Sequence, residues 1–159
     1  MSDPIKSDSP EGAVDLPRFV RLGPSIYTAS KTSQAWRWRG LRDKGFNIIA
    51  TWIDEAEEGQ SADYADLAQR CIEEAAAADI TILYCQPGDI LKGALLEVGA
   101  ALAAGKEVRC VGDCESISRV FRKHPRWIEC DSLAASLPNA GGDLPPPSTP
   151  ESKKDAYGG

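Results

Sequence analysis

The chain has 159 residues, enough for one domain with its own core, and it is acidic, with 24 Asp and Glu against 18 Lys and Arg. This negative balance argues against a nucleic-acid-binding protein and leaves a small polar ligand open. No apolar run approaches the roughly 20 residues that span a bilayer, and the polar N-terminus lacks the apolar core of a signal peptide, so we expect a cytoplasmic protein without membrane contact.

Both ends of the chain are polar. Residues 1–17 are rich in Ser, Asp and Pro, and residues 138–159 in Pro, Gly and Ser. Segments of this composition hold too few apolar residues to build a core. We therefore predict two disordered tails around a single folded α/β domain at residues 18–137.

Within 18–137, strand-like and helix-like segments alternate. Short apolar segments bounded by Gly or Pro predict strands at residues 25–29, 46–52, 80–85, 107–111 and 126–130. Helical spacing of apolar residues predicts helices at residues 32–44, 61–78, 93–105, 115–122 and 131–137, with an acidic loop at 54–60. This alternation predicts a three-layer, flavodoxin-like or Rossmann-like sandwich, with a five-stranded parallel sheet in the order 2-1-3-4-5.

In that order the switch point lies between the first and third predicted strands, where open α/β sheets bind their ligands. Two loops would flank it, at residues 30–33 and 86–92. The helix after the second loop carries Glu97, the only charge in an otherwise apolar run from Gly93 to Gly105. A carboxylate in such a helix is costly unless it is solvated, paired or used. We expect Glu97 to point into the crevice between the loops.

Glu97 has two competing interpretations. A carboxylate can attack the anomeric carbon of a sugar and form a covalent glycosyl-enzyme, which divides one hard step into two. Tyr27, near the end of the first strand, is the candidate hydrogen-bond donor that would keep it ionised. Alternatively, Glu97 pairs with a basic residue at a subunit contact, and the residue pattern alone does not separate the two.

The two loops supply further candidates. Ser30, Lys31 and Ser33 offer hydroxyls, an ammonium and backbone amides for a phosphate or a ribose hydroxyl, although a plain helix cap explains them equally simply. Asp89 lies on the opposite rim, and the small Gly93 leaves room for a ligand. The sequence has no P-loop and no GxGxxG motif, so we expect no nucleotide cofactor.

Trp52 and Asp54 follow the second predicted strand. The indole could stack on a nucleobase while Asp54 bonds the edge of the base; the alternative is a core or lid tryptophan. Cys110 and Cys114 lack a second cysteine pair or a nearby His, so no metal site is expected. The odd number of cysteines, five, favours reduced thiols. Helices 32–44 and 61–78 offer more apolar surface than one small sheet needs, which predicts a homodimer or larger homo-oligomer.

Three stretches of this chain resemble the nucleoside 2-deoxyribosyltransferase-like superfamily, including its short bacterial and phage members. They are SIYTAS (25–30), AAADITILY (76–84) and, above all, GALLEVGAALAAGKEV (93–108). The resemblance implies that Glu97 is the nucleophile, that Tyr27 orients it, and that oligomers close the site. The chain departs from the family at Cys71 and at Leu91, where many members carry acidic residues.

The hypothesis from the sequence is an N-glycosidic bond enzyme, a deoxyribosyltransferase or an N-hydrolase, acting on a (deoxy)nucleoside or its 5′-monophosphate. Asp54 or Asp89 would assist the leaving base. The alternative is a non-catalytic module that binds a nucleotide or related metabolite in the same crevice. A third interpretation is a structural subunit whose Ala-rich helices only form an oligomer.

Overall fold

The computed structural model describes residues 23–56 and 61–138, so nearly all of both predicted tails lies outside the described residues. Four parallel strands form one sheet in the order β1-β2-β3-β4. Their bounds are β1 (Ile26–Ala29), β2 (Ile80–Tyr84), β3 (Glu107–Val111) and β4 (Trp127–Cys130). Within the described ranges, no helix is long and apolar enough to cross a membrane.

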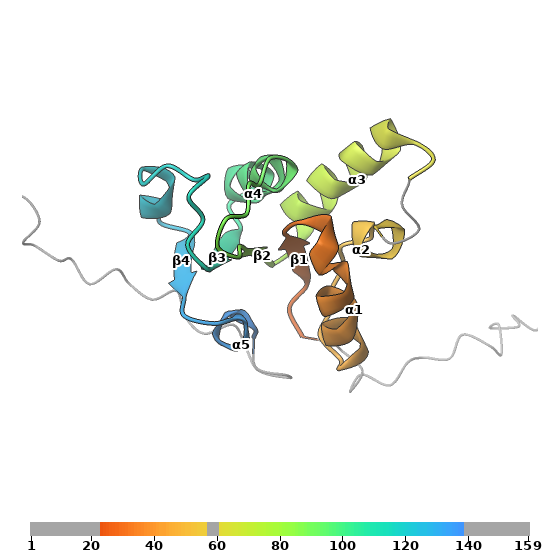
Figure 1. Cartoon of the computed structure of the whole chain (residues 1–159), viewed down its shortest axis with the longest axis horizontal. Helices are drawn as coiled ribbons and strands as arrows, with labels where there is room; N and C mark the ends of the chain where they lie inside the picture. Colours follow the sequence, from red (N-terminus) through yellow and green to blue (C-terminus); the bar gives the residue numbers. More distant parts are fainter. Residues whose placement is uncertain (1–22, 57–60, 139–159) are drawn as a thin grey trace, which may run out of the picture.

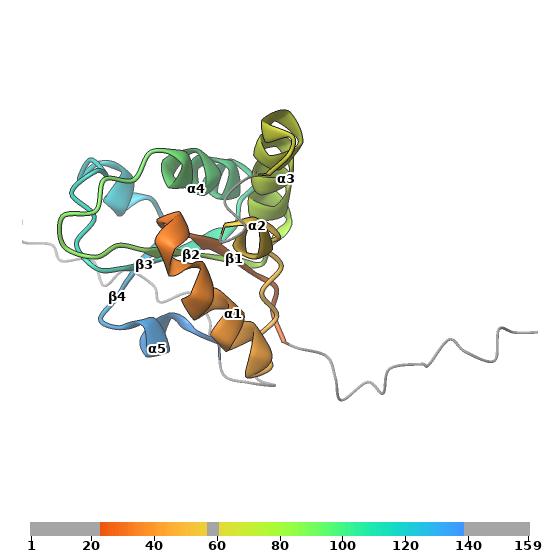
Figure 2. The same ribbon diagram turned by 45° about the vertical axis from the view of Figure 1, so that its right-hand side comes forward.

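Helices cover both faces of this sheet (Figure 1). The longer pair, α3 (Tyr64–Ala77) and α4 (Gly93–Ala103), lies on one face, and α1 (Ala35–Asp43) and the short α5 (Leu133–Ser136) lie on the other. Figure 2 shows the same layers from a second direction, with α2 (Trp52–Glu55) beside β1. The predicted three-layer parallel architecture is thus confirmed at the level of an α/β fold.

The predicted five-stranded order is not confirmed, because residues 46–52 do not form a strand. Only one bridge joins this segment to the sheet, between Ile26 and Ile48. The Ile26 N–H donates to the Asn47 carbonyl (2.8 Å) and the Ile26 carbonyl accepts from Ile49 (2.9 Å), while Ser25 bonds β2 on the opposite side. The segment therefore lies at the outer edge of β1 but departs after one bridge, and Trp52 already begins α2.

Two further expectations need correction. The acidic loop predicted from residue 54 begins inside α2, and its residues 57–60 lie outside the described ranges. The helix predicted at 115–122 is absent; only a short 3-10 turn, Phe121–Lys123, forms there. The guanidinium of Arg122 anchors this segment by donating to the Cys114 carbonyl (2.8 Å) and pairing with Asp113 and Glu129.

Local chemistry explains where the other elements begin and end. Asp63 caps α3 by accepting hydrogen bonds from the backbone of Ala65 and Asp66, and Ser132 caps α5 by accepting one from Ala135. After β3, Gly112 has a positive φ of 92° and passes so close to β2 that a Cβ there would lie 1.9 Å from the Cys85 carbonyl oxygen. Only glycine fits at that crossing.

The two faces of β1 lead to different surroundings. Tyr27 is fully buried, and its hydroxyl lies near Cys71 of α3 and Glu97 of α4. Ser30, just past the strand, instead accepts a hydrogen bond from the indole of Trp38 in α1 (2.8 Å). The sheet therefore separates the Glu97 surroundings from the contacts of Ser30.

Candidate active site

Glu97 lies where α4 packs against α3 and β1. Its neighbours on α4 are small or apolar, and Ala94, Val98 and Ala101 are buried against the rest of the domain. Cys71 and Ala75 are the buried residues of α3. Because these side chains are small, the two helices can lie close together, and Glu97 remains partly exposed between them. In the described part of the chain, Glu97 forms no ion pair with Lys or Arg.

This position changes the acidity of Glu97. Burial raises the pKa of the Glu97 carboxyl to about 7, because the low-dielectric surroundings disfavour the charged form. The Tyr27 hydroxyl and the Cys71 thiol act in the opposite direction, and the nearby charge of Glu74 adds to the rise. Glu97 is therefore poised to change its protonation state near neutral pH, as acid–base and nucleophilic groups in active sites often are.

The Tyr27 hydroxyl lies close to Glu97, but no hydrogen bond to it has good geometry. Its oxygen is buried and has no aligned partner among residues 23–56 and 61–138. Burial, followed by the charge of Glu97, raises the pKa of the Tyr27 hydroxyl, so it stays a neutral donor. Thr81, paired with Tyr27 in the β1–β2 register, also has a buried hydroxyl without a partner. Buried polar groups left unpaired in this way cost free energy.

The two loops expected to flank the crevice are tied to each other. The Lys31 ammonium pairs with the Asp89 carboxylate at 3.1 Å, and the Gln34 amide donates to Gln86 at 3.1 Å. Asp89 also accepts a hydrogen bond from the backbone of Gln86, which, with Lys31, lowers the pKa of the Asp89 carboxyl. A carboxyl held ionised in this way is a poor proton donor for a leaving base.

The remaining predicted residues of this rim lie as follows. Ser30 accepts from Trp38 and donates to the Lys31 carbonyl (3.0 Å). Ser33 is exposed, and Gly93 is the exposed first residue of α4, with open space around its Cα.

Trp52 and Asp54 occupy the short helix α2. Trp52 is buried, and its indole N–H donates to the carbonyl of Thr28 at 2.8 Å, so most of its ring belongs to the core. Asp54 forms a two-bonded ion pair with Arg42 of α1, at 2.8 and 2.7 Å, which lowers the pKa of its carboxyl. Binding of a base by Asp54 would require this pair to open.

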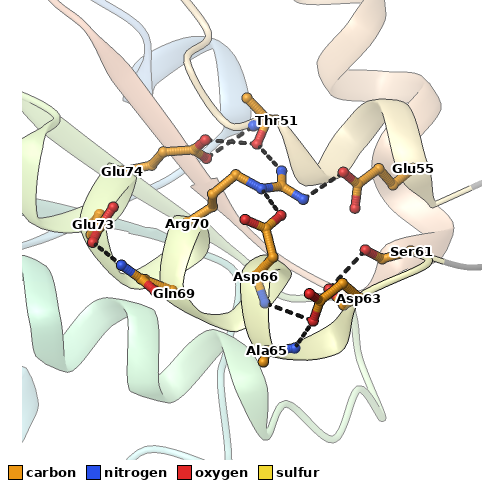
Figure 3. A network of polar contacts seen from close by, with 10 residues as sticks. All are labelled: Thr51, Glu55, Ser61, Asp63, Ala65, Asp66, Gln69, Arg70, Glu73 and Glu74. Carbon is orange, nitrogen blue, oxygen red and sulfur yellow. Dashed lines mark hydrogen bonds and ion pairs between the residues drawn. The ribbon is translucent and has the colours of Figure 1, made fainter.

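Reasoning from the sequence did not single out Glu55. It assigned base binding to Asp54 because it treated the neighbouring residues as the end of a strand. In the helix that forms instead, Asp54 faces α1, whereas Glu55 faces α3 and pairs with Arg70 at 2.6 Å. The sequence holds no local signal for this pair (Figure 3), because Glu55 and Arg70 are 15 residues apart and lie on two different helices.

The sequence matches no protein-family model and no curated protein. Among solved structures, the chain is similar to the CMP N-glycosidase BcmB from Clostridium botulinum, with a TM-score of 0.45 and 16% sequence identity. The similarity covers 70% of this chain and 92% of that one. At this identity and TM-score, it carries no inference about activity.

Proposed function

We propose that this protein is an N-glycosidic bond enzyme that acts on a (deoxy)nucleoside or its 5′-monophosphate, with Glu97 as nucleophile. The observation that carries the proposal is the position of Glu97 next to the fully buried hydroxyl of Tyr27, on a helix that follows a central strand of a parallel sheet. The motif resemblance around residues 93–108 supports the same reaction class.

In the proposed first step, an ionised oxygen of Glu97 forms a bond to C1′ of the sugar. The C1′–N bond breaks, and its electron pair leaves with the base, which takes up a proton from solvent. In the second step, water or another base attacks C1′ and gives up a proton to solvent, the ester bond to Glu97 breaks, and the carboxylate is restored. Tyr27 would orient the attacking oxygen, and Cys71 would shield the other side of the carboxylate.

The loop after β1 remains the proposed place for the sugar or phosphate end of the substrate. Lys31 is half-exposed and carries the charge that would meet a phosphate there, with Ser30 and Ser33 beside it. Binding a phosphate would exchange the Lys31–Asp89 pair for a Lys31–phosphate pair. Asp89, Asp54 and Trp52 keep their proposed contacts with the substrate only if the side-chain pairs described above open, whereas the space at Gly93 is already open.

These occupied pairs favour a second candidate function, a module that binds a nucleotide or related metabolite without cleaving it. The acidic group that would protonate the base is either paired, as at Asp54 and Asp89, or replaced, as at Leu91. This candidate predicts binding of nucleosides or monophosphates with no release of free base.

One experiment separates the two functions. The full chain is incubated with the common deoxynucleosides, ribonucleosides and their 5′-monophosphates, and free base is measured by chromatography. The proposed enzyme releases base from at least one of them, and Glu97→Gln, which keeps the shape of the side chain, lowers this release by about 10³-fold or more. If the Glu97→Gln variant still releases base at the parent rate, Glu97 is not the nucleophile. If the parent chain binds these compounds without releasing base, the second candidate function is supported.

A further inference from the structure

A groove with mostly apolar walls lies on the face of the sheet opposite Glu97. It runs between α1 and α5, which share the side of the sheet away from α3 and α4 (Figure 2). Its volume is about 440 Å³, within the range of roughly 300–1,000 Å³ that is usual for binding pockets. Its apolar walls are formed mainly by Trp36, Leu41, Phe46, Leu133 and Leu137. The groove can therefore hold an apolar occupant of several side chains.

The walls of this groove are not covered by the described part of the chain. The side chain of Trp36 is 56% exposed. The Arg37 guanidinium lies over its ring, 4.7 Å from the ring centroid, and holds the indole in place. Four other walls pack against the core yet are only half-buried: Leu41, Phe46, Leu133 and Leu137. Contiguous apolar surface of this kind marks an interaction site, because covering it removes that surface from water.

The chain enters the described structure beside this groove. Gly23 is the first described residue, and its carbonyl accepts a hydrogen bond from the side-chain amide of Asn47 at 3.4 Å. Asn47 directly follows Phe46, one of the groove walls. An extended chain spans at most about 3.3–3.6 Å per residue, so the nine residues before Gly23 can reach up to about 30 Å from this point. They are long enough to lie along the groove.

The segment that precedes Gly23 is itself apolar. Residues 14–22 read VDLPRFVRL, and five of these nine residues are Val, Leu or Phe. The segment at the other end of the chain, residues 139–159, also begins near the groove, after Leu137. Its large apolar residues are Leu144 and Tyr157 alone, among 21 residues rich in Pro, Gly and Ser. Residues 14–22 therefore match an apolar groove better than residues 139–159 do.

We propose that residues 14–22 of this chain dock in the groove between α1 and α5, with Leu16 and Phe19 covering Trp36 and the neighbouring apolar walls. The N-terminal segment would then be part of the folded domain and would close the face of the sheet opposite Glu97. Because the groove lies on that opposite face, the inference does not depend on the proposed function.

The charges of the two surfaces fix how the segment would lie. The charged residues that line the groove, Arg37 and Lys44, are both basic. Asp15 of the segment can therefore approach them, whereas Arg18 and Arg21 would be repelled and would keep their guanidinium groups in water. Docking would thus bury the apolar side chains of the segment and leave both arginines at the surface.

Limited digestion of the full chain by trypsin tests the docking. Cleavage after Arg18 or Arg21 requires the backbone to leave the groove, whereas Lys6 lies outside the segment. In the parent chain, cleavage after either arginine should be at least about 10-fold slower than cleavage after Lys6. In the double variant Leu16→Ser, Phe19→Ser, which removes the proposed anchors, the rates at Arg21 and Lys6 should agree within about twofold.

Tryptophan fluorescence gives a second, independent measurement. Trp38, Trp52 and Trp127 are buried, so an indole that solvent can reach is that of Trp36. In the parent chain, docking should protect Trp36 from quenching by acrylamide. The double variant should lose this protection, and its emission should shift to longer wavelength. Adding Trp36→Phe should abolish the difference, which assigns the signal to Trp36.

A substitution in the groove tests the same contact from the other side. Ala134 and Ala135 are neighbouring exposed residues of α5, and of the two Ala134 lines the groove. Ala134→Lys places a charged side chain among the apolar walls and should speed cleavage after Arg21 to within about twofold of that after Lys6. Ala135→Lys is the matched control and should leave the parent pattern unchanged. If Ala134→Lys fails to fold, as judged by circular dichroism, the double variant still tests the inference from outside the described domain.

Several results would overturn the inference. One is equally fast cleavage of the parent chain at Lys6, Arg18 and Arg21; another is equal quenching of Trp36 in the parent and the double variant. Leu144→Ser should change neither reading, and exposure of Trp36 by this variant alone would identify residues 139–159 as the occupant instead. Protection of Trp36 that is lost on dilution, together with a change from dimer to monomer in size-exclusion chromatography, would identify a second copy of the chain.

Discussion

The surroundings of Glu97 and the loops at the mouth of the sheet differ in how their polar groups are satisfied. Between the loops, charged and amide groups are paired, with Lys31 on Asp89 and Gln34 on Gln86. Around Glu97, the hydroxyl of Tyr27 is buried without a partner, and burial raises the pKa of the Glu97 carboxyl to about 7. The polar groups between the loops are thus paired, whereas in the described part of the chain the Glu97 cluster holds a buried hydroxyl without a hydrogen-bond partner and a carboxyl without an ion pair.

This difference makes the motif around Glu97 a better guide to a candidate site than the geometry of the loops. Paired surface charges contribute little to stability, typically about 0–1 kcal/mol, and are readily exchanged. An unpaired buried hydroxyl costs more and persists only when the surrounding fold enforces it. In the proposed function, Glu97 and Tyr27 would therefore act on the reacting bond, and the loops would supply secondary contacts.

The largest effect is expected when the hydroxyl of Tyr27 is removed. Tyr27→Phe removes the buried hydroxyl and keeps the ring, so base release should fall by about 10- to 100-fold, the effect of losing a hydrogen bond to a charged group. The melting temperature should stay the same or rise slightly, because an unpartnered polar atom is removed from the core. Paired measurements of kcat/KM and thermal unfolding check both effects. Full activity of the Tyr27→Phe variant would show that the Tyr27 hydroxyl does not position Glu97.

The stability of the protein should depend on the ionisation of Glu97. The folded-state pKa of about 7 lies above the ordinary value of 4.5, so the folded state binds the proton more tightly than the unfolded state. The contribution of Glu97 to stability is therefore fully present below about pH 4.5 and is lost as pH rises through about 7.

Glu97→Gln should remove this loss. Compared with the parent chain, the variant should melt at a higher temperature at pH 8, and the difference should shrink toward pH 4.5. Differential scanning calorimetry across that range measures it. A difference that does not vary with pH would show that the carboxyl keeps its ordinary pKa when folded.

The smallest effect is expected at Lys31. Lys31→Met breaks a half-exposed ion pair, so the free energy of unfolding should change by no more than about 1 kcal/mol. If the loop holds a phosphate, KM should rise by about 10-fold for a 5′-monophosphate and stay within twofold for the matching nucleoside. Equal effects on both substrates would place the phosphate elsewhere.

Much of the fold could be predicted from the sequence because hydrophobic periodicity is strong in most of its elements. The long helix α3, the Glu97 helix and the four strands that form all carried such patterns. Residues 46–52 are equally apolar, yet they form only one bridge to the sheet. The strand prediction failed there because apolar content does not distinguish a buried edge segment from a strand. In the segment 115–122 only a short 3-10 turn forms, and the Arg122 guanidinium there bonds the Cys114 carbonyl, a tertiary contact that no local pattern encodes.

The candidate site was predicted in part for the same reason. The spacing of Glu97 in its helix and of Tyr27 in its strand follows from local pattern, and the structure brings these two residues together. The pairing of Lys31 with Asp89, or of Glu55 with Arg70, depends on how loops and helices pack across distances that the sequence does not specify. The sequence does not specify that Glu55, rather than Asp54, faces α3, because this depends on α2 being a helix.

The central claim is that Glu97 forms a covalent bond to the sugar, and trapping that bond tests it most directly. The full chain is mixed with the deoxynucleoside it cleaves, quenched with acid within milliseconds to seconds, and analysed by peptide mass spectrometry. The proposal predicts a mass increase equal to the sugar residue on the peptide that contains Glu97, with no such increase in Glu97→Gln. Base release accompanied by a sugar adduct on a different residue would contradict it.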